Sequence, residues 1–153
     1  MSTIADSLLI KDIHSQLKAN DHRDALEELL SPLRSDSRVR DWENLRSALL
    51  ADSPNDYFAE SPSILFLHHS RTESVSSLVL TLGRSKEGIA LPGQEHRIHL
   101  VIAAAIPEAL NNEYLRILGA ISRICREPST LSGLLEAKGQ AEILTVLEKG
   151  CLQ

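Results

Sequence analysis

The sequence is poor in aromatic residues, in cysteine and in positive charge. Aromatic residues make up 3% of the 153 residues, so a folded core must be built from Leu, Ile, Val and Ala. Cys125 and Cys151 are too few and too unpatterned for a disulfide framework or a zinc site. The formal charge is −5, with 16 Lys and Arg against 21 Asp and Glu. This balance argues against a nucleic-acid partner, because no basic stripe is available to neutralise phosphates.

Long hydrophobic runs and targeting signals are also missing. The longest nearly apolar stretch, Leu100 to Ile106, is far too short to cross a bilayer. The amino terminus shows no basic region followed by an apolar one. No Gly-x-Gly-x-x-Gly, Walker loop or Gly-x-Ser-x-Gly elbow occurs, so neither nucleotide binding nor serine hydrolysis is supported. We therefore expect a cytoplasmic protein without membrane insertion, metal or cofactor. The sequence does not fix its oligomeric state.

The remaining residues alternate between helical and strand-like patterns, with no linker between them. Alternating or continuous apolar runs predict strands at 12–17, 63–67, 77–82 and 97–106, with a turn over 83–88. Helical spacing predicts helices over 21–33 and 39–50, and further helices beginning near 111, 128 and 140. The last strands have short connections without a crossover helix, so the sheet should be mixed. We expect a single domain over residues 1–153, with a three-layer α/β/α fold and a mixed, about five-stranded sheet flanked by helices.

The segment Ile64 to Thr72 is where function is expected. A four-residue apolar run ends in His68, His69, Ser70 and Arg71. Ligand sites in α/β domains tend to lie where the carboxyl end of a strand opens into a loop. A metal clamp on the histidine pair is disfavoured, because adjacent side chains on a strand point to opposite faces. A histidine that carries a phosphoryl group would need donors around the phosphate oxygens, which Ser70 and Arg71 supply. The alternative is that the two histidines merely end a strand.

The same segment resembles a known family. Leu67-His68-His69-Ser70-Arg71-Thr72 is similar to the apolar-Pro-His-Ala/Gly-Arg segment of the enzyme IIA domain of the bacterial phosphotransferase system (PTS), of the fructose, mannitol and nitrogen-regulatory type. Further similarity lies in three groups of segments, at 80–89, at 98–107 and at 114–118 with 134–137. The resemblance implies that His69 is the phospho-acceptor and Arg71 its basic neighbour. Arg84 is a second cation considered for the phosphohistidine.

The resemblance also implies partners and a mechanism. His69 would accept phosphate from an HPr-like phosphocarrier and pass it to a IIB domain or use it for regulation. Three positions depart from the family's pattern: 59–63 lacks its glycines, Ala51-Asp52 stands where it tends to carry an arginine, and Tyr114 replaces a second histidine. Tyr114 can still donate one hydrogen bond to a phosphate. These departures favour an alternative, a IIA-like regulatory interaction module with weak or no phosphotransfer. A histidine-based hydrolase or metal enzyme is the least supported alternative.

Overall fold

The computed structural model describes residues 12–51, 57–60, 63–90 and 97–151, which form an α/β domain. Its elements, in chain order, are β1 (Ile13–His14), α2 (His22–Leu30), the 3-10 helix η2 (Ser31–Ser35), α3 (Trp42–Leu50), β2 (Tyr57–Glu60), β3 (Ser63–Thr72), β4 (Val79–Ile89), β5 (Ile98–Pro107), α4 (Asn111–Arg126), α5 (Pro128–Glu136) and α6 (Gln140–Cys151). Within these described residues, no helix combines the length and the apolar character needed to span a membrane.

The strands form one sheet in the order β1–β4–β5–β3–β2. The pairs β1·β4 and β3·β5 are parallel, whereas β2·β3 and β4·β5 are antiparallel. The prediction of an α/β domain with a mixed sheet is therefore confirmed. The longest strands, β3, β4 and β5, lie at its centre, and β5 is paired on both sides.

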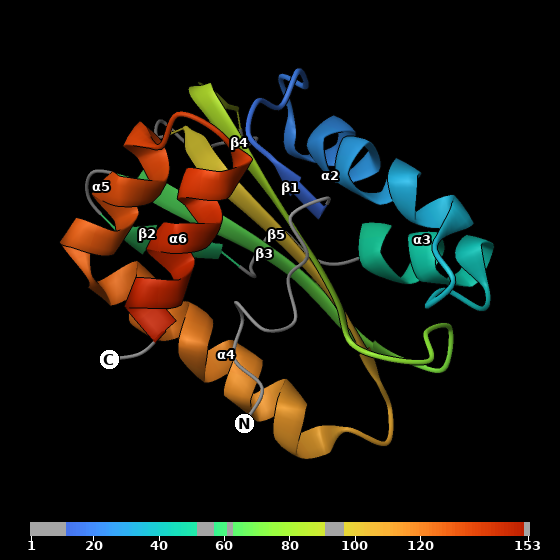
Figure 1. Cartoon of the computed structure of the whole chain (residues 1–153). Coiled ribbons are helices and arrows are strands. Elements are labelled where there is room, and N and C mark those ends of the chain that lie inside the picture. Colours follow the sequence, from blue (N-terminus) through green and yellow to red (C-terminus); the bar gives the residue numbers. More distant parts are fainter. Residues whose placement is uncertain (1–11, 52–56, 61–62, 91–96, 152–153) are drawn as a thin grey trace.

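Helices cover both faces of this sheet, with α2 and α3 on one side and α4, α5 and α6 on the other (Figure 1). Both faces of β5 are buried, as expected for a central strand, and its residues alternate between two hydrophobic clusters. Its even-numbered residues from 100 to 106 pack with buried side chains of α4, α5 and α6, namely Ala120, Leu131, Leu134, Ile143 and Leu147. Its odd-numbered residues from 101 to 105 pack on the face of α2 and α3. The long apolar run in the sequence is thus explained by burial on two sides.

Local capping residues explain where the helices begin, and α3 begins at Trp42 instead of the predicted residue 39. Asp21 caps α2 by accepting a hydrogen bond from the Asp24 amide at 2.8 Å. Asp41 caps α3 in the same way through the Asn44 amide. Pro32 falls at the start of η2, so the expected tightening of the helix at this proline is confirmed. The expected helix start at Pro128 is also confirmed.

Several predicted strand limits are wrong. The strand predicted over 12–17 is only Ile13–His14. Beyond it, the Leu17 amide donates to the Arg84 carbonyl of β4, and the amides of Lys18 and Ala19 donate to the carboxylate of Glu28. The strand predicted to end at 67 continues to Thr72 in parallel pairing with β5. The turn predicted over 83–88 lies within β4, which has an irregularity between Arg84 and Ile89. The short strand β2 was not predicted.

Candidate functional site

The predicted phospho-acceptor lies on β3, near the edge of the sheet at which β3 and β5 both end. Thr72, the last residue of β3, is level with Pro107, the last residue of β5. His69 is level with Ala104 and Arg71 with Ile106. Both β5 residues belong to the cluster packed against α4, α5 and α6. The side chains of His69, Arg71 and Tyr114 lie outside what the structure describes, so their chemical roles stay predictions.

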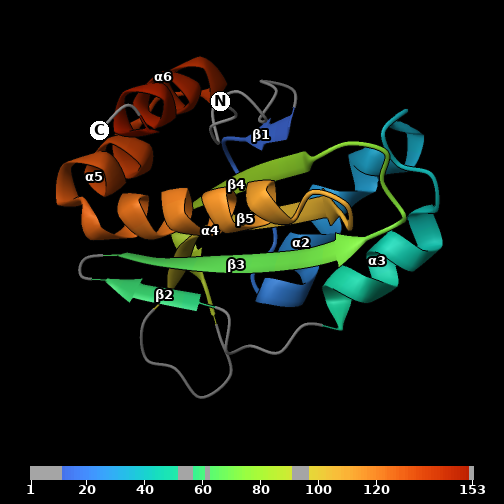
Figure 2. The same cartoon turned by 90° about the horizontal axis from the view of Figure 1, so that it is seen from below.

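The helix that carries Tyr114 begins at this same edge. After Pro107, a short turn in which the Leu110 amide donates to the Pro107 carbonyl at 2.9 Å leads directly into α4. Figure 2 shows α4 running alongside β5 and β3, with its first turn at the end toward which the β3 arrow points. Tyr114 is in that first turn. The fold therefore brings the backbones of the His69 strand and the Tyr114 helix to one edge of the sheet.

The β5 residues level with the histidine pair are small. Ala103, Ala104 and Ala105 are opposite His68, His69 and Ser70, and all three alanines are buried. Alanine is not the usual choice for a buried central strand, where Val, Ile and Leu predominate. Three small side chains therefore stand next to the His69 segment in the sheet.

The segment that follows β3 is fixed by hydrogen bonds that sequence reasoning missed. The Ser74 amide donates to Thr72 Oγ1 at 3.0 Å, and the Ser74 hydroxyl accepts from Asn44 Nδ2 at 2.6 Å. The Ser74 carbonyl accepts the amides of Arg40 and Asp41, at 2.6 and 3.2 Å. Ser74 is only 2% exposed, so these bonds are shielded from water. They attach the exit of the His69 strand to the first turn of α3.

A buried ionic cluster supports this attachment. The guanidinium of Arg38 donates to Asp36 at 2.7 and 2.9 Å and to Asp12 Oδ2 at 3.0 Å. The hydrogen bonds to Asp36, and secondarily to Asp12, raise the pKa of Arg38 above its usual value despite partial burial. The Arg38 carbonyl in turn accepts from the Ser76 amide at 2.8 Å. With two carboxylates bound to it, Arg38 is not a free cation for a phosphate.

Arg84 does not lie at the predicted site, which corrects one expectation. It is level with Leu100, four residues along β5 from Ala104, which corresponds to about 13 Å in a strand. Its side chain is fully buried and donates to the carbonyls of Ser15 and Leu134, both at 3.0 Å, and to that of Ala137. Burial lowers the pKa of this guanidinium. Arg84 therefore joins β4 to the carboxyl end of α5 and has no role at a phosphohistidine on β3.

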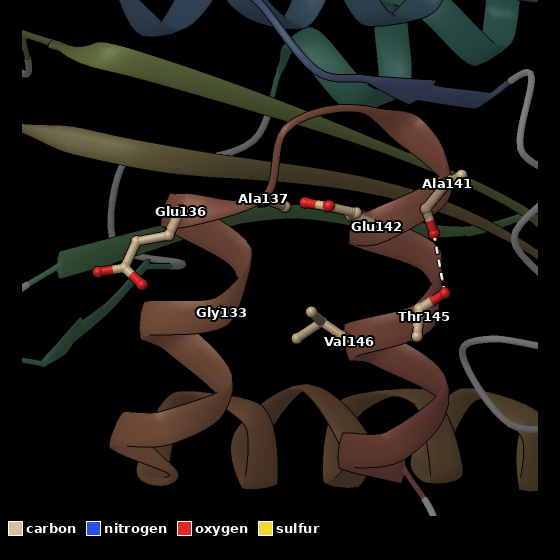
Figure 3. A pocket seen from close by; sticks show the side chains of 7 residues that line it. All are labelled: Gly133, Glu136, Ala137, Ala141, Glu142, Thr145 and Val146. Carbon is tan, nitrogen blue, oxygen red and sulfur yellow. Dashed lines mark hydrogen bonds between the residues drawn. The ribbon is translucent and has the colours of Figure 1, made fainter.

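A groove of about 410 Å³ between α5 and α6 is also separate from the predicted site (Figure 3). Val146 points across it to Gly133, where an added Cβ would lie 3.0 Å from Val146 Cγ1. None of the predicted site residues lines it. Across the described parts of the chain, no three His, Cys, Asp or Glu side chains gather into a possible metal-binding group.

An α/β domain with this mixed sheet, and with a histidine segment at its strand edge, matches one protein family along nearly the whole chain. The family model described as phosphoenolpyruvate-dependent sugar phosphotransferase system, EIIA 2, matches residues 7–150. The chain belongs to this family. A curated relative, the fructose-specific EIIABC component of the PTS of Bacillus subtilis, is 24% identical over 149 residues, which is 95% of this chain. The match spans 23% of that relative's length.

Solved structures share the fold. The nitrogen regulatory protein IIA-Ntr from Neisseria meningitidis superimposes with a TM-score of 0.74 at 17% identity, over 94% of this chain and 98% of that one. The cryptic mannitol-specific enzyme IIA CmtB of Escherichia coli superimposes with a TM-score of 0.73 at 17% identity, over 97% of this chain and 99% of that one. The mannitol enzyme IIA of E. coli, in its complex with phosphorylated enzyme IIB, superimposes with a TM-score of 0.73 at 18% identity, over 91% of this chain and 95% of that one.

Proposed function

We propose that this protein is a phosphoryl carrier of the PTS in which His69 receives the phosphoryl group. One observation supports the proposal. The segment that resembles the family's phosphohistidine motif lies on β3, and its His69 is three residues before the end of that strand, at the edge where α4 begins. We infer that the whole chain, 1–153, is a single IIA domain of the three-layer, about five-stranded type. Arg71 and the hydroxyl of Tyr114 are the groups that we assign to the phosphoryl oxygens.

The donor in this proposal is an HPr-like phosphocarrier. An unprotonated ring nitrogen of His69 attacks the phosphorus, and a new N–P bond forms as the N–P bond of the donor phosphohistidine breaks. The donor imidazole leaves with the electron pair and takes up a proton. In the onward step, a nucleophilic side chain of a IIB domain attacks the phosphorus, its new bond to phosphorus forms as the N–P bond of His69 breaks, and the imidazole of His69 leaves with the electron pair and takes up a proton. The E. coli mannitol IIA, which shares this fold, forms a complex with phosphorylated IIB. The proposal places the protein in the cytoplasm, where phosphoenolpyruvate is formed.

A second candidate function is a regulatory module of the same family with weak or no phosphotransfer. Arg84, the second cation considered for the site, is bound to backbone carbonyls about 13 Å along the sheet. Ala51, where the family tends to carry an arginine, caps the end of α3. A preorganised donor that is missing from a transition state typically costs about 3 kcal/mol, which is a factor of more than one hundred in rate. We expect slow phosphoryl transfer, because neither Arg84 nor Ala51 supplies a cation to the phosphoryl group.

One experiment tests both candidates. The purified protein is incubated with phosphoenolpyruvate, enzyme I and HPr, and mass spectrometry follows an acid-labile phosphoryl group over time. His69→Ala should abolish the label, and the matched variant His68→Ala should retain it. A carrier is labelled within the turnover time of the donor system, whereas a regulatory module is labelled far more slowly. If the protein is labelled slowly, Tyr114→His, which adds an imidazole that can be cationic, should raise the rate of labelling at least tenfold.

Three outcomes contradict the proposal in different ways. Absence of label on the wild-type protein, with a known IIA protein labelled in the same mixture, rejects the carrier. A label that persists in His69→Ala and disappears in His68→Ala assigns the chemistry to the neighbouring histidine. A label that is stable to acid points to a residue other than histidine.

A further inference from the structure

A second pocket lies at the opposite end of the sheet from His69. Its volume is about 450 Å³, and it is enclosed between the segment after β1 and the last part of β4. Its lining residues are Gln16, Leu17, Lys18, Ala19, Asn20, Ser85, Lys86, Glu87 and Gly88. Two backbone hydrogen bonds join the segment after β1 to the last part of β4: Leu17 N donates to Arg84 O at 2.8 Å, and Ala90 N donates to Asn20 O at 3.0 Å. The two walls are therefore held at a fixed separation.

Among the described residues, four polar side chains of this pocket have no hydrogen-bond or ion-pair partner, whereas the Ser85 hydroxyl accepts the Gly88 amide at 3.0 Å. Gln16, Lys18, Asn20 and Lys86 are exposed, and within the described residues their side chains make no hydrogen bond or ion pair. These four groups provide two ammonium cations and two amide donors. The carboxylate among the lining residues is that of Glu87, and the carboxylate of Glu28 is already bound to the amides of Lys18 and Ala19. Unpaired cations facing one cavity attract a negatively charged ligand, because their mutual repulsion is relieved when it binds.

The backbone of one wall is already organised around an anion. The carboxylate of Glu28, on α2, accepts the amides of Lys18 at 3.1 Å and Ala19 at 3.0 Å. Consecutive amides that converge on a carboxylate form an anion-binding concavity. Glu28 occupies that concavity and thereby fixes the backbone of Lys18. The ammonium of Lys18 is left available to the pocket.

We propose that this pocket binds a small organic anion that carries a carboxylate or phosphate group. Lys18 and Lys86 pair with the anionic group, and the amides of Gln16 and Asn20 donate to its remaining oxygens. Ser85 lies five residues along β4 from Leu80, the residue aligned through Ala104 with His69. Five residues correspond to about 17 Å, too far for a ligand in this pocket to touch a phosphoryl group on β3. The pocket is thus a separate site, and its occupancy does not depend on the proposed phosphotransfer.

The test is an NMR titration of the ¹⁵N-labelled full chain at constant ionic strength. Inorganic phosphate and succinate are the two probes, sodium chloride is the reference, and the amides of Lys18, Ala19, Lys86 and Gly88 are the reporters. We expect saturable shifts for at least one probe, with a Kd of about 1 mM. The probe that saturates at the lower concentration identifies phosphate or carboxylate as the preferred group. His69→Ala should bind equally well, which separates this result from the outcome of the phosphorylation experiment.

Variants localise the binding. Lys18→Gln and Lys86→Gln should each weaken the saturable binding about tenfold, because each removes one exposed cation. Lys149→Gln, an exposed lysine on α6 outside the pocket, is the matched control and should change nothing. Shifts that rise linearly with both probes, as with chloride, overturn the proposal. Saturable binding that survives the double substitution of Lys18 and Lys86 overturns it as well.

Discussion

Replacement of Arg84 by methionine should destabilise the protein more than replacement of any single exposed charged residue. The guanidinium is fully buried and bridges three segments through the carbonyls of Ser15, Leu134 and Ala137. It also lies at the carboxyl end of α5, where a cation complements the helix dipole. Methionine retains the apolar part of the side chain, so the substitution removes mainly the hydrogen bonds and the charge.

The magnitude follows from opposing terms. Hydrogen bonds to charged groups contribute about 1.5–3 kcal/mol each, and a buried carbonyl left without a donor costs about 1–3 kcal/mol. Against this, the variant no longer holds a charge away from water, a cost that is evident in the lowered pKa of Arg84. We expect a net loss of about 2–4 kcal/mol in the free energy of unfolding. For a chain of this length that is a fall in Tm of roughly 5–15 °C.

Urea denaturation followed by circular dichroism measures the loss directly. Arg84→Lys should recover about half of it, because one ammonium cannot reach both Ser15 and the end of α5. Arg116→Met is the matched control: Arg116 is 46% exposed and 4.0 Å from Glu113 on the same helix, so its loss should be below about 0.5 kcal/mol. A result for Arg84→Met within about 0.5 kcal/mol of that control would refute the reasoning.

Three further outcomes are expected. Burial lowers the pKa of His14, so the unfolded chain binds a proton more readily than the native one, and stability falls as the pH drops below the ordinary value of 6.5. His14→Gln should reduce the difference in unfolding free energy between about pH 7.5 and about pH 5.5, and an unchanged difference would exclude His14 as its source. Gly119→Ala should stabilise the protein by about 0.5–1 kcal/mol, because an added Cβ meets nothing closer than 3.8 Å, whereas Gly133→Ala should gain less because of the contact with Val146. An equal rise in Tm for the two glycine variants in thermal melts would contradict this difference, because it would show that α5 and α6 move apart without cost. Gly88→Ala should cost more than about 1 kcal/mol, because φ is +88° and the new Cβ would lie 2.6 Å from Arg97 Cβ; a Tm equal to that of the wild type would contradict this.

The helices were predictable because their signals are local. Asp21 and Pro128 mark helix starts through a hydrogen bond or ring geometry within one turn of the chain. The strand limits were not predictable to the same degree. His68 to Thr72 read as the end of a strand, yet their backbone is paired with 103–107, more than thirty residues away. Gly83 and Gly88 read as turn residues. Gly83 is paired with Val101 of β5, whereas Gly88, with a φ of +88°, lies in the irregular part of β4 between Arg84 and Ile89.

The family and the candidate phospho-acceptor could be predicted from the amino-acid order alone, because the motif around His69 is a contiguous run of residues. The amino-acid order also determined that the fold is α/β, because helical and strand periodicities are local patterns. The tertiary structure was needed to show that Arg84 is distant from that motif. It brought the helix of Tyr114 to the edge where the His69 strand ends, and it placed Arg84 four register positions away on the carbonyls of α5. The physical reason is that strand pairing and burial join residues that are distant in the chain, and no local pattern encodes which ones meet.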